Sequence, residues 1–393
     1  MNDQSPRFKL IEREVDLVAY CERAREGEWA AIDTEFVREN TYYPILCLIQ
    51  IATAAGEVAC IDMQAMEKPQ AMIDLLLDNH VVKVLHSGSQ DMEIFSQLCG
   101  ETPQNVFDTQ IAAPLFGHPE QMGYASLVQE RLSVTLDKTQ SRTDWRKRPL
   151  TQSQLNYAAD DVIYLAQLYP AMRSALIQSG RLEWLRDEFE QLCDITNYQR
   201  AAEDMWLRIR HTDRLPKTAL SIVQSLACWR EKTARNSNIP RNWVMKDDAI
   251  IDIARLQPKN LDDLESLRNL ANGTVNKHGQ TLLDIVEQAR NRQPIPLPAG
   301  KRKHKPSAQQ DALIDLLSVV AKLQADQHCI NHAVLAPRKE LEKLVLGDSN
   351  SRLLNGWRAH FVGKALQQLL RGEMSVWVNE SGDVLLKEKG NDS

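Results

Sequence analysis

The sequence predicts a mixed α/β domain followed by two small all-helical bundles. Strand-like segments at 29–37, 45–53 and 57–63 follow one another as a meander, and later ones at 81–86 and 106–108 alternate with helical segments. Strand patterns stop after about residue 200, where amphipathic helices take over. We therefore expect a mixed five-stranded sheet flanked by helices in the first half of the chain.

Helical periodicity fills the gaps between these strands. It is seen at 70–79, 88–98, 123–130 and 152–168. Asp108 is expected to be the N-cap of the helix after the last strand, because an Asp side chain accepts hydrogen bonds from the free N–H groups of a first helical turn.

The expected domains are 1–200, 212–292 and 306–388. The last two are helical, and the segment between them, 291–306, is rich in proline and contains basic but no acidic residues. Its Pro-x-Pro-x-Pro part favours an extended, semi-rigid linker. Neither helical region contains a cluster of catalytic residue types, so both are interpreted as binding or positioning modules.

Composition excludes several classes of function. The net charge of −6 over 393 residues gives no global field that attracts nucleic acid, so any such binding must use local basic patches. There is no run of about 18 apolar residues and no nucleotide-binding phosphate loop, which argues against a membrane protein and an NTPase. The seven cysteines have no paired spacing and are expected to be reduced, as in a cytoplasmic protein.

Two acidic residues interrupt the apolar strand 29–37. Asp33 and Glu35 are two positions apart, so their side chains point to the same face of the strand. With 53 acidic residues in the chain, this spacing also arises by chance, but seldom inside an apolar strand. Two carboxylates this close repel each other, and a divalent cation with oxygen ligands is the usual remedy.

A third acid follows the strand 81–86. After a turn at Gly88, Asp91 lies in the first turn of a helix, near the edge of the sheet where ligands gather in open α/β folds. Taken alone, Asp91 is better explained as a side chain that interacts favourably with the helix dipole.

A tyrosine and a fourth acid share one face of the helix 152–168. Tyr157 and Asp161 are four residues apart, and their row continues with apolar residues that should face the sheet. Asp160, three residues after Tyr157, competes with Asp161, but its row is more polar. We therefore expect Asp161 to point inward and Asp160 to be solvated.

Together these motifs resemble the DEDDy 3′–5′ exonucleases of the ribonuclease-H-like fold, and most closely the bacterial ribonuclease D family. The segments that carry the resemblance are 33–36, 85–91, 107–109, 143–150 and 157–162. Residues 212–292 resemble an HRDC domain, and 306–388 resemble a degenerate second copy of it. Each motif is weak alone, but their order and spacing are specific.

The resemblance implies a metal-dependent 3′–5′ exoribonuclease. Two divalent ions, Mg²⁺ or Mn²⁺, would be held by the carboxylates of Asp33, Glu35, Asp91 and Asp161, and oxygen-only ligands suit these ions better than zinc. Tyr157 would orient the attacking water, since a free phenol is a poor base at neutral pH. The expected substrates are RNA 3′ ends, by resemblance those of precursor tRNA and other structured small RNAs, and a monomer is expected.

Three further residues are candidates for substrate binding. Phe36 could stack on the terminal base, although a strand phenylalanine is more often a core residue. His86 could contact the phosphate or brace the turn before Asp91. Arg148 lies in the basic segment 138–148, which could follow a nucleic-acid backbone or be a solvated loop.

Three alternatives remain open from sequence. The same site could degrade DNA, because the contact to the 2′-hydroxyl that separates RNA from DNA is not visible in the motifs. The chain could be an inactive nucleic-acid-binding scaffold, which the complete acid set argues against. It could also be a helicase accessory protein, which the helical modules suggest.

Overall fold

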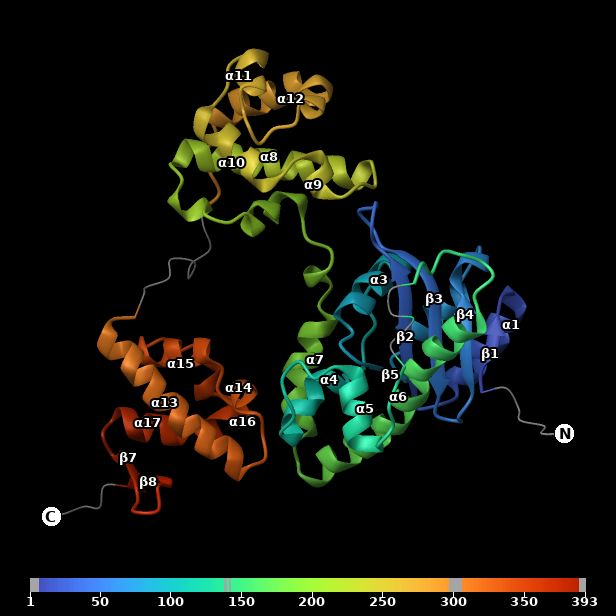
Figure 1. Cartoon of the computed structure of the whole chain (residues 1–393), viewed down its shortest axis with the longest axis vertical. Coiled ribbons are helices and arrows are strands. Elements are labelled where there is room, and N and C mark those ends of the chain that lie inside the picture. Colours follow the sequence, from blue (N-terminus) through green and yellow to red (C-terminus); the bar gives the residue numbers. More distant parts are fainter. Residues whose placement is uncertain (1–6, 138–139, 141–142, 297–305, 389–393) are drawn as a thin grey trace.

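The computed structural model describes residues 7–137, 140, 143–296 and 306–388. It contains an α/β domain, a first helical bundle and a second bundle that lies beside the α/β domain (Figure 1). Among the described helices, none combines the length and the apolar character that a membrane crossing requires.

A six-stranded mixed sheet forms the centre of the α/β domain, in the order β1-β4-β3-β2-β5-β6. The strands are β1 (Lys9–Ile11), β2 (Trp29–Val37), β3 (Ile45–Thr53), β4 (Val58–Asp62), β5 (Val82–Leu85) and β6 (Val106–Asp108). The meander β2-β3-β4 is antiparallel, whereas β1, β5 and β6 each add in parallel to a neighbour. The sequence led us to expect five strands. β1 was missed because its three residues are too few to show an alternating pattern and, unlike the equally short β6, it does not lead into a helix with a side-chain cap.

Helices cover both faces of this sheet. On one face lie α1 (Glu14–Arg25), α2 (Gln70–Leu77) and α3 (Ser89–Cys99), whose buried side chains share a core with those of β2 and β3. On the other face lie α4 (Thr109–Ala112), α5 (Tyr124–Leu132) and α6 (Gln152–Gln178), and α7 (Arg186–Cys193) follows. Their apolar faces are buried against the sheet, which is the main source of stability of such layered domains.

Helix α6 is ten residues longer than expected, because it continues from 168 to Gln178 through Pro170. Proline inside a helix removes one backbone hydrogen bond. Here the apolar row continues beyond it with Met172 and Leu176, both buried, so packing offsets that loss. The helix begins in a capping box formed by Thr151 and Gln154.

The first bundle has a core of its own. It consists of α8 (Lys217–Asn236), α9 (Arg241–Val244), α10 (Asp247–Leu256), α11 (Leu261–Glu265) and α12 (Asn272–Arg290). Its core also includes Trp206 and Ile209, which lie before the expected start of this domain. Asn260 caps α11 by accepting a hydrogen bond from the Asp263 N–H.

The second bundle contains α13 (Ala308–Gln327), α14 (His332–Leu335), α15 (Arg338–Val345), α16 (Gly356–Arg358) and α17 (Lys364–Leu370). The sequence led us to expect an all-helical bundle, and this was wrong. The bundle ends in a hairpin of β7 (Met374–Val378) and β8 (Val384–Glu388). These two strands are short and pair only with each other across a turn. Alternation of polar and apolar residues over so few positions is a weak signal in the sequence.

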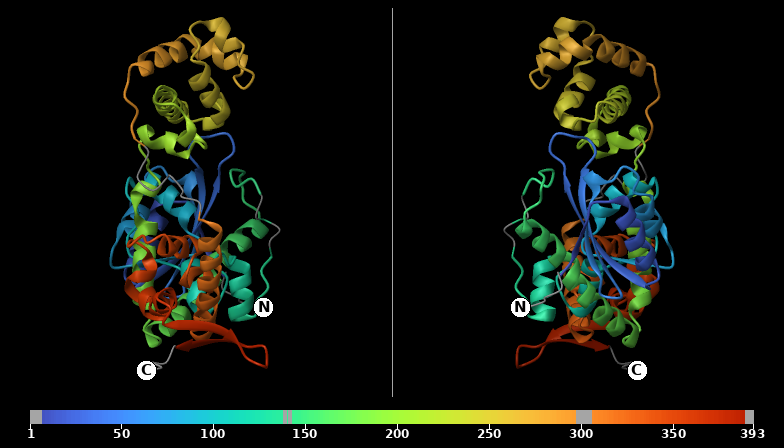
Figure 2. Two further views of the ribbon diagram at one scale, coloured as in Figure 1. Left: turned by 90° about the vertical axis from the view of Figure 1, so that its left-hand side faces the viewer. Right: turned by 90° about the vertical axis from the view of Figure 1, so that its right-hand side faces the viewer.

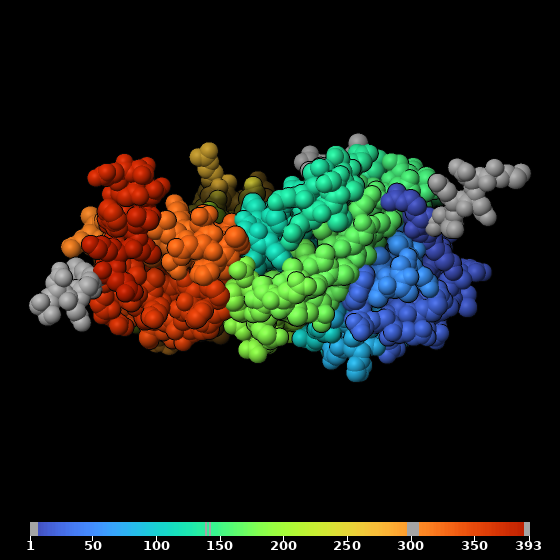
Figure 3. Space-filling view, turned by 90° about the horizontal axis from the view of Figure 1, so that it is seen from below, coloured from blue at the N-terminus to red at the C-terminus, as the bar shows by residue number. Residues whose placement is uncertain are grey.

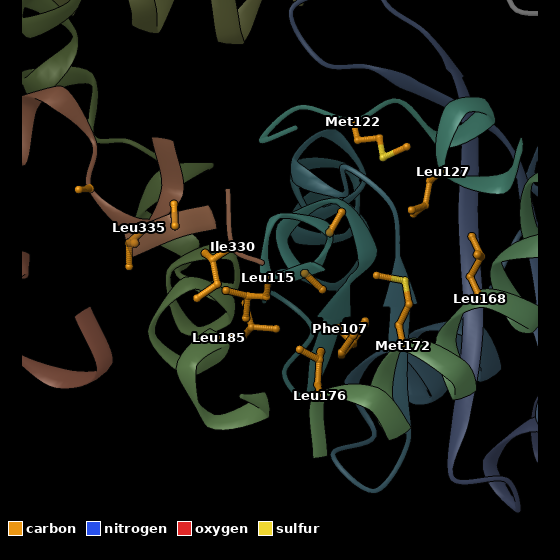
Figure 4. Close-up of a cluster of buried hydrophobic side chains, with 14 of the residues drawn as sticks. Phe107, Leu115, Met122, Leu127, Leu168, Met172, Leu176, Leu185, Ile330 and Leu335 are labelled. Carbon is orange, nitrogen blue, oxygen red and sulfur yellow. The ribbon is translucent and has the colours of Figure 1, made fainter. Parts of the chain in front are cut away.

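The second bundle shares its hydrophobic core with the α/β domain. Ile330 and Leu335 belong to one buried cluster with Leu115 and Leu185 (Figure 4), and the space-filling view shows the two parts in close contact (Figure 3). At the boundary the rings of Trp184 and Trp357 stack with their centroids 4.9 Å apart.

Ion pairs reinforce this boundary. Oε1 of Glu188 on α7 accepts hydrogen bonds from Arg352 at 2.6 Å and from the buried Arg358 at 3.0 Å. Arg181 also donates to the carbonyl oxygens of Leu115 at 2.8 Å and His328 at 2.7 Å. The second bundle is therefore built into the α/β domain rather than tethered to it.

This shared core predicts that Leu335→Ala destabilises the α/β domain by about 2–5 kcal/mol, because it removes a fully buried side chain. Hydrogen exchange of the β2 and β3 amides, measured by mass spectrometry, should accelerate. Leu282→Ala, which empties the separate core of the first bundle, should leave β2 and β3 protected. Unchanged exchange in both variants would contradict the shared core.

Candidate active site

Three carboxylates converge beside the middle of the sheet. β2 presents Asp33 and Glu35 on one face, and α6, which packs across this face, brings Asp161 to them. One carboxylate oxygen from each of the three lies within 4.8 Å of the others. Residues some 130 positions apart in the chain therefore meet at one point, as the motif spacing indicated.

Asp91, on α3, is linked to this group by a hydrogen bond from β2. β2 pairs with β5 only over Trp29–Ala31, so the part of β2 that carries the acids extends beyond its neighbour. The hydroxyl of Thr34, between the two acids, donates a hydrogen bond of 2.5 Å to Asp91 in the first turn of α3. The charge of Asp91 contributes to raising the pKa of both Asp33 and Glu35.

The turn that leads to Asp91 is held by Asp108. Its carboxylate accepts hydrogen bonds from the backbone N–H groups of Ser87 at 3.1 Å and Gly88 at 2.7 Å. It also caps α4, as the sequence indicated. A Cβ at position 88 would lie 2.5 Å from a side-chain carbon of Leu85, so glycine is needed for this close approach.

The electrostatics of the group favour a bound cation. Burial, with added repulsion from neighbouring acids, raises the pKa of Asp33 well above its usual range and that of Glu35 to about 9. Burial likewise raises the pKa of Asp161 to about 7 and that of Asp91 to about 6. Among the described residues no ion pair is formed by any of these four carboxylates, and a group with oxygen as its donor type suits a hard divalent cation.

Asp161 rather than Asp160 occupies the inward position. The carboxylate of Asp160 forms an ion pair with Arg7. Tyr157, one turn before Asp161, is half-buried, and among the described residues its hydroxyl has no hydrogen-bond partner. Burial, and then the charges of Asp161 and Glu35, raise the pKa of the Tyr157 phenol, so it remains protonated and can donate a hydrogen bond at neutral pH.

Sequence reasoning missed Tyr124, a second phenol at this site. It lies on α5, and its hydroxyl donates to the backbone carbonyl of Asp160 at 3.0 Å. Burial and the charges of Asp161 and Asp33 raise its pKa. No local pattern could indicate this position, because only the packing of α5 on α6 brings Tyr124 to the acids.

The structure gives His86 a bracing position. Its Nδ1 lies 2.9 Å from the hydroxyl of Thr109 and its Nε2 lies 3.1 Å from the carbonyl oxygen of Met122. Its ring also meets that of Tyr124 edge to face at 5.4 Å. Both ring nitrogens are thus engaged within the protein, and contact between His86 and the substrate stays a prediction.

Arg148 is likewise held by the protein. Its guanidinium donates to both carboxylate oxygens of Asp62, at 2.5 and 2.7 Å. Its other N–H groups donate to three backbone carbonyls, those of Trp145, Lys147 and Cys47. With its five donors engaged, Arg148 fastens its segment to the sheet. Of the basic segment 138–148, residues 138–139 and 141–142 lie outside the described residues.

The contact of Phe36 with substrate stays a prediction. It is half-buried at a β-bulge next to Glu35, and it belongs to none of the four hydrophobic clusters found among the described residues. The bulge is a local irregularity of the kind that re-aims side chains beside functional sites.

Comparison with known proteins agrees with this geometry. Residues 8–177 match the model of a family described as 3′–5′ exonuclease, and residues 219–286 match the HRDC domain. The chain is 39% identical to the ribonuclease D of Zymomonas mobilis over 376 residues, which are 94% of this chain and 96% of that protein. It is 36% identical to the ribonuclease D of Sphingobium indicum, with the same two shares covered.

A solved structure extends the similarity to three dimensions. The crystal structure of Escherichia coli RNase D, described as an exoribonuclease involved in structured RNA processing, superimposes with a TM-score of 0.80 at 33% identity. The match covers 93% of this chain and 99% of the other. The acid cluster on a mixed sheet, the helical HRDC region and relatives over nearly the full length together show that the chain belongs to the ribonuclease D family of 3′–5′ exoribonucleases.

Proposed function

We propose that this enzyme releases 5′-mononucleotides from RNA 3′ ends with two divalent metal ions, Mg²⁺ or Mn²⁺, held by Asp33, Glu35, Asp91 and Asp161. The observation that carries the proposal is the meeting of three carboxylate oxygens within 4.8 Å, beside a fourth acid. Carboxylates this close repel one another when ionised, and this repulsion is costly unless a cation relieves it.

When bound, two such ions would activate a water for in-line attack and stabilise the departing 3′ oxygen. The protein's own groups position the reactants. Thr34 and Asp108 hold Asp91 and its turn in place. Tyr157 donates a hydrogen bond that orients the attacking water, since its raised pKa keeps it protonated. Phe36 stacks on the terminal base from its position next to Glu35.

The natural substrates we propose are precursor tRNAs and other structured small RNAs. Support comes from the E. coli structure, whose description names structured RNA processing. Trimming of a precursor tRNA with a short 3′ trailer, followed on a sequencing gel, tests this. Arrest of the enzyme far from the mature end would count against tRNA as a substrate.

The metal site predicts that Asp33→Asn slows the release of labelled nucleotide from 3′-labelled RNA by at least about a hundredfold, because it removes one charged ligand. EDTA should abolish the release. Asp160→Asn, which changes the neighbouring acid paired with Arg7, is the matched control and should retain activity. Matched DNA substrates belong in the same assay, and equal degradation of DNA would favour the DNA exonuclease alternative.

The role of Tyr157 predicts that Tyr157→Phe lowers kcat by about tenfold to a hundredfold, because the water loses its orienting donor. The increase in Tm on adding Mg²⁺ should be unchanged, since the carboxylates remain. Tyr164→Phe alters a half-buried tyrosine on the same helix that packs against the core and should have little effect. Normal turnover by Tyr157→Phe would refute this role.

The raised pKa values predict a pH-dependent stability of the metal-free enzyme. Glu35, Asp161 and Asp91 titrate at about 9, 7 and 6 in the folded chain, above the value of about 4 in unfolded chains. The folded state therefore binds more protons, and its stability falls as the pH rises from about 4 through these folded values.

In EDTA, the Tm should therefore decrease between about pH 5.5 and pH 8.5, and Asp161→Asn should flatten this decrease. Mg²⁺ should raise the Tm more at the higher pH. The carboxylates must lose their protons to bind the ion, and at higher pH fewer protons remain on them. Asp284→Asn, on the exposed surface of the first bundle, should retain the wild-type slope. A Tm that is independent of pH would contradict the assigned electrostatics.

A further inference from the structure

A pocket of about 390 Å³ lies between the α/β domain and the first bundle. One wall is the hairpin that joins β2 to β3, which reaches α9 in Figure 1 and touches the bundle in both views of Figure 2. The other wall comes from the segment before α8 and from α8 to α10. The charged side chains that line the pocket are Arg38, Arg208, Arg230, Arg241, Glu39 and Asp247, an excess of two positive charges.

The hairpin ties these walls together. The hydroxyl of Tyr42 donates to the fully buried Glu231 of α8 and accepts a hydrogen bond of 3.1 Å from Arg235. The backbone N–H groups of Tyr42 and Tyr43 both donate to the side chain of Asn238 at 3.1 Å. The pocket is thus preformed by specific contacts and is not a loose gap between domains.

One of the arginines has exposed hydrogen-bond donors that the described part of the chain leaves unused. Among the described residues, Arg208 forms no ion pair, and burial together with the charges of Arg241 and Arg200 lowers its pKa. Arg230, by contrast, is buried with 4% of its surface exposed and already pairs with Asp247 at 2.7 Å, and its Nε, which has no acceptor in the described part of the chain, is itself buried. An exposed arginine without a carboxylate partner, as Arg208 is among the described residues, is typical of sites that bind phosphate.

The pocket adjoins the acid cluster along the chain. Arg38 follows Val37, the last residue of β2, and lies three positions after Glu35, a span of at most about 11 Å. Arg38 also pairs at 2.7 Å with Glu93, two residues after Asp91 on α3. A strand whose 3′ end lies at the carboxylates can therefore reach the pocket with a phosphate further upstream.

We propose that this pocket binds a backbone phosphate of the RNA strand upstream of the 3′ end, with Arg208 as the principal contact. The proposal rests on the proposed function for its ligand and adds a second binding site to it. Such a site holds long substrates on the enzyme between successive cleavages, whereas a dinucleotide is too short to occupy both places.

The test measures binding and turnover separately. In EDTA, fluorescence anisotropy with a single-stranded RNA should show that Arg208→Glu weakens binding about fivefold to tenfold and lowers the salt slope by about one. Arg268→Glu makes the same charge change on the exposed surface of the first bundle and should have a much smaller effect. Arg208→Gln serves if the reversed charge perturbs folding, and thermal unfolding checks both variants.

With Mg²⁺, Arg208→Glu should raise KM for a long RNA and leave kcat and the hydrolysis of a dinucleotide unchanged. An equal loss on the dinucleotide would place Arg208 at the reacting end and overturn the proposal, as would wild-type affinity for long RNA. Competition by 5′-AMP or inorganic phosphate that equals competition by RNA would identify a free-phosphate site instead. Normal RNA binding by a wild-type enzyme that lacks nuclease activity would refute the proposed function but not the pocket.

Discussion

The α/β domain holds four carboxylates close together against their mutual repulsion, and this constraint explains much of its architecture. β2 carries two of them and is anchored by pairing with β3 from Ala30 to Val37, while α6 fixes the third through a long apolar row buried on the sheet. Burial of these apolar surfaces supplies the free energy that offsets the repulsion. The fourth acid, Asp91, accepts a hydrogen bond from Thr34, and the turn before it is held because Asp108 accepts a hydrogen bond from the Gly88 N–H.

The two helical regions are attached to this domain in different ways. The second bundle shares a continuous apolar core with it, closed by the stacked Trp184 and Trp357 and the Glu188 ion pairs. The first bundle has its own core and meets the hairpin β2–β3 through polar groups around Glu231. Because this hairpin continues the strand that carries Asp33 and Glu35, the position of the first bundle is linked directly to the acid cluster.

Most of the fold could be predicted from local patterns. The strands β2 to β5 and the longer helices carry clear patterns, and caps such as Asp108, which marks the end of the short β6, and Asn260 follow from side-chain chemistry. The edge strand β1 and the hairpin β7–β8 were missed because short strands carry little pattern. The end of α6 was placed too early because proline argues against a helix locally, whereas the buried row beyond Pro170 is a tertiary effect.

The sequence by itself determined which residues form the acid set, because strand and helix periodicity orient side chains within each element and the motif order identifies the family. It did not determine which groups the fold brings around that set. The approach of Tyr124, the engagement of His86 and Arg148 within the protein, and the arginine pocket beside β2 arise from packing between elements distant in the chain. These contacts depend on distances in three dimensions, which spacing along a sequence does not encode.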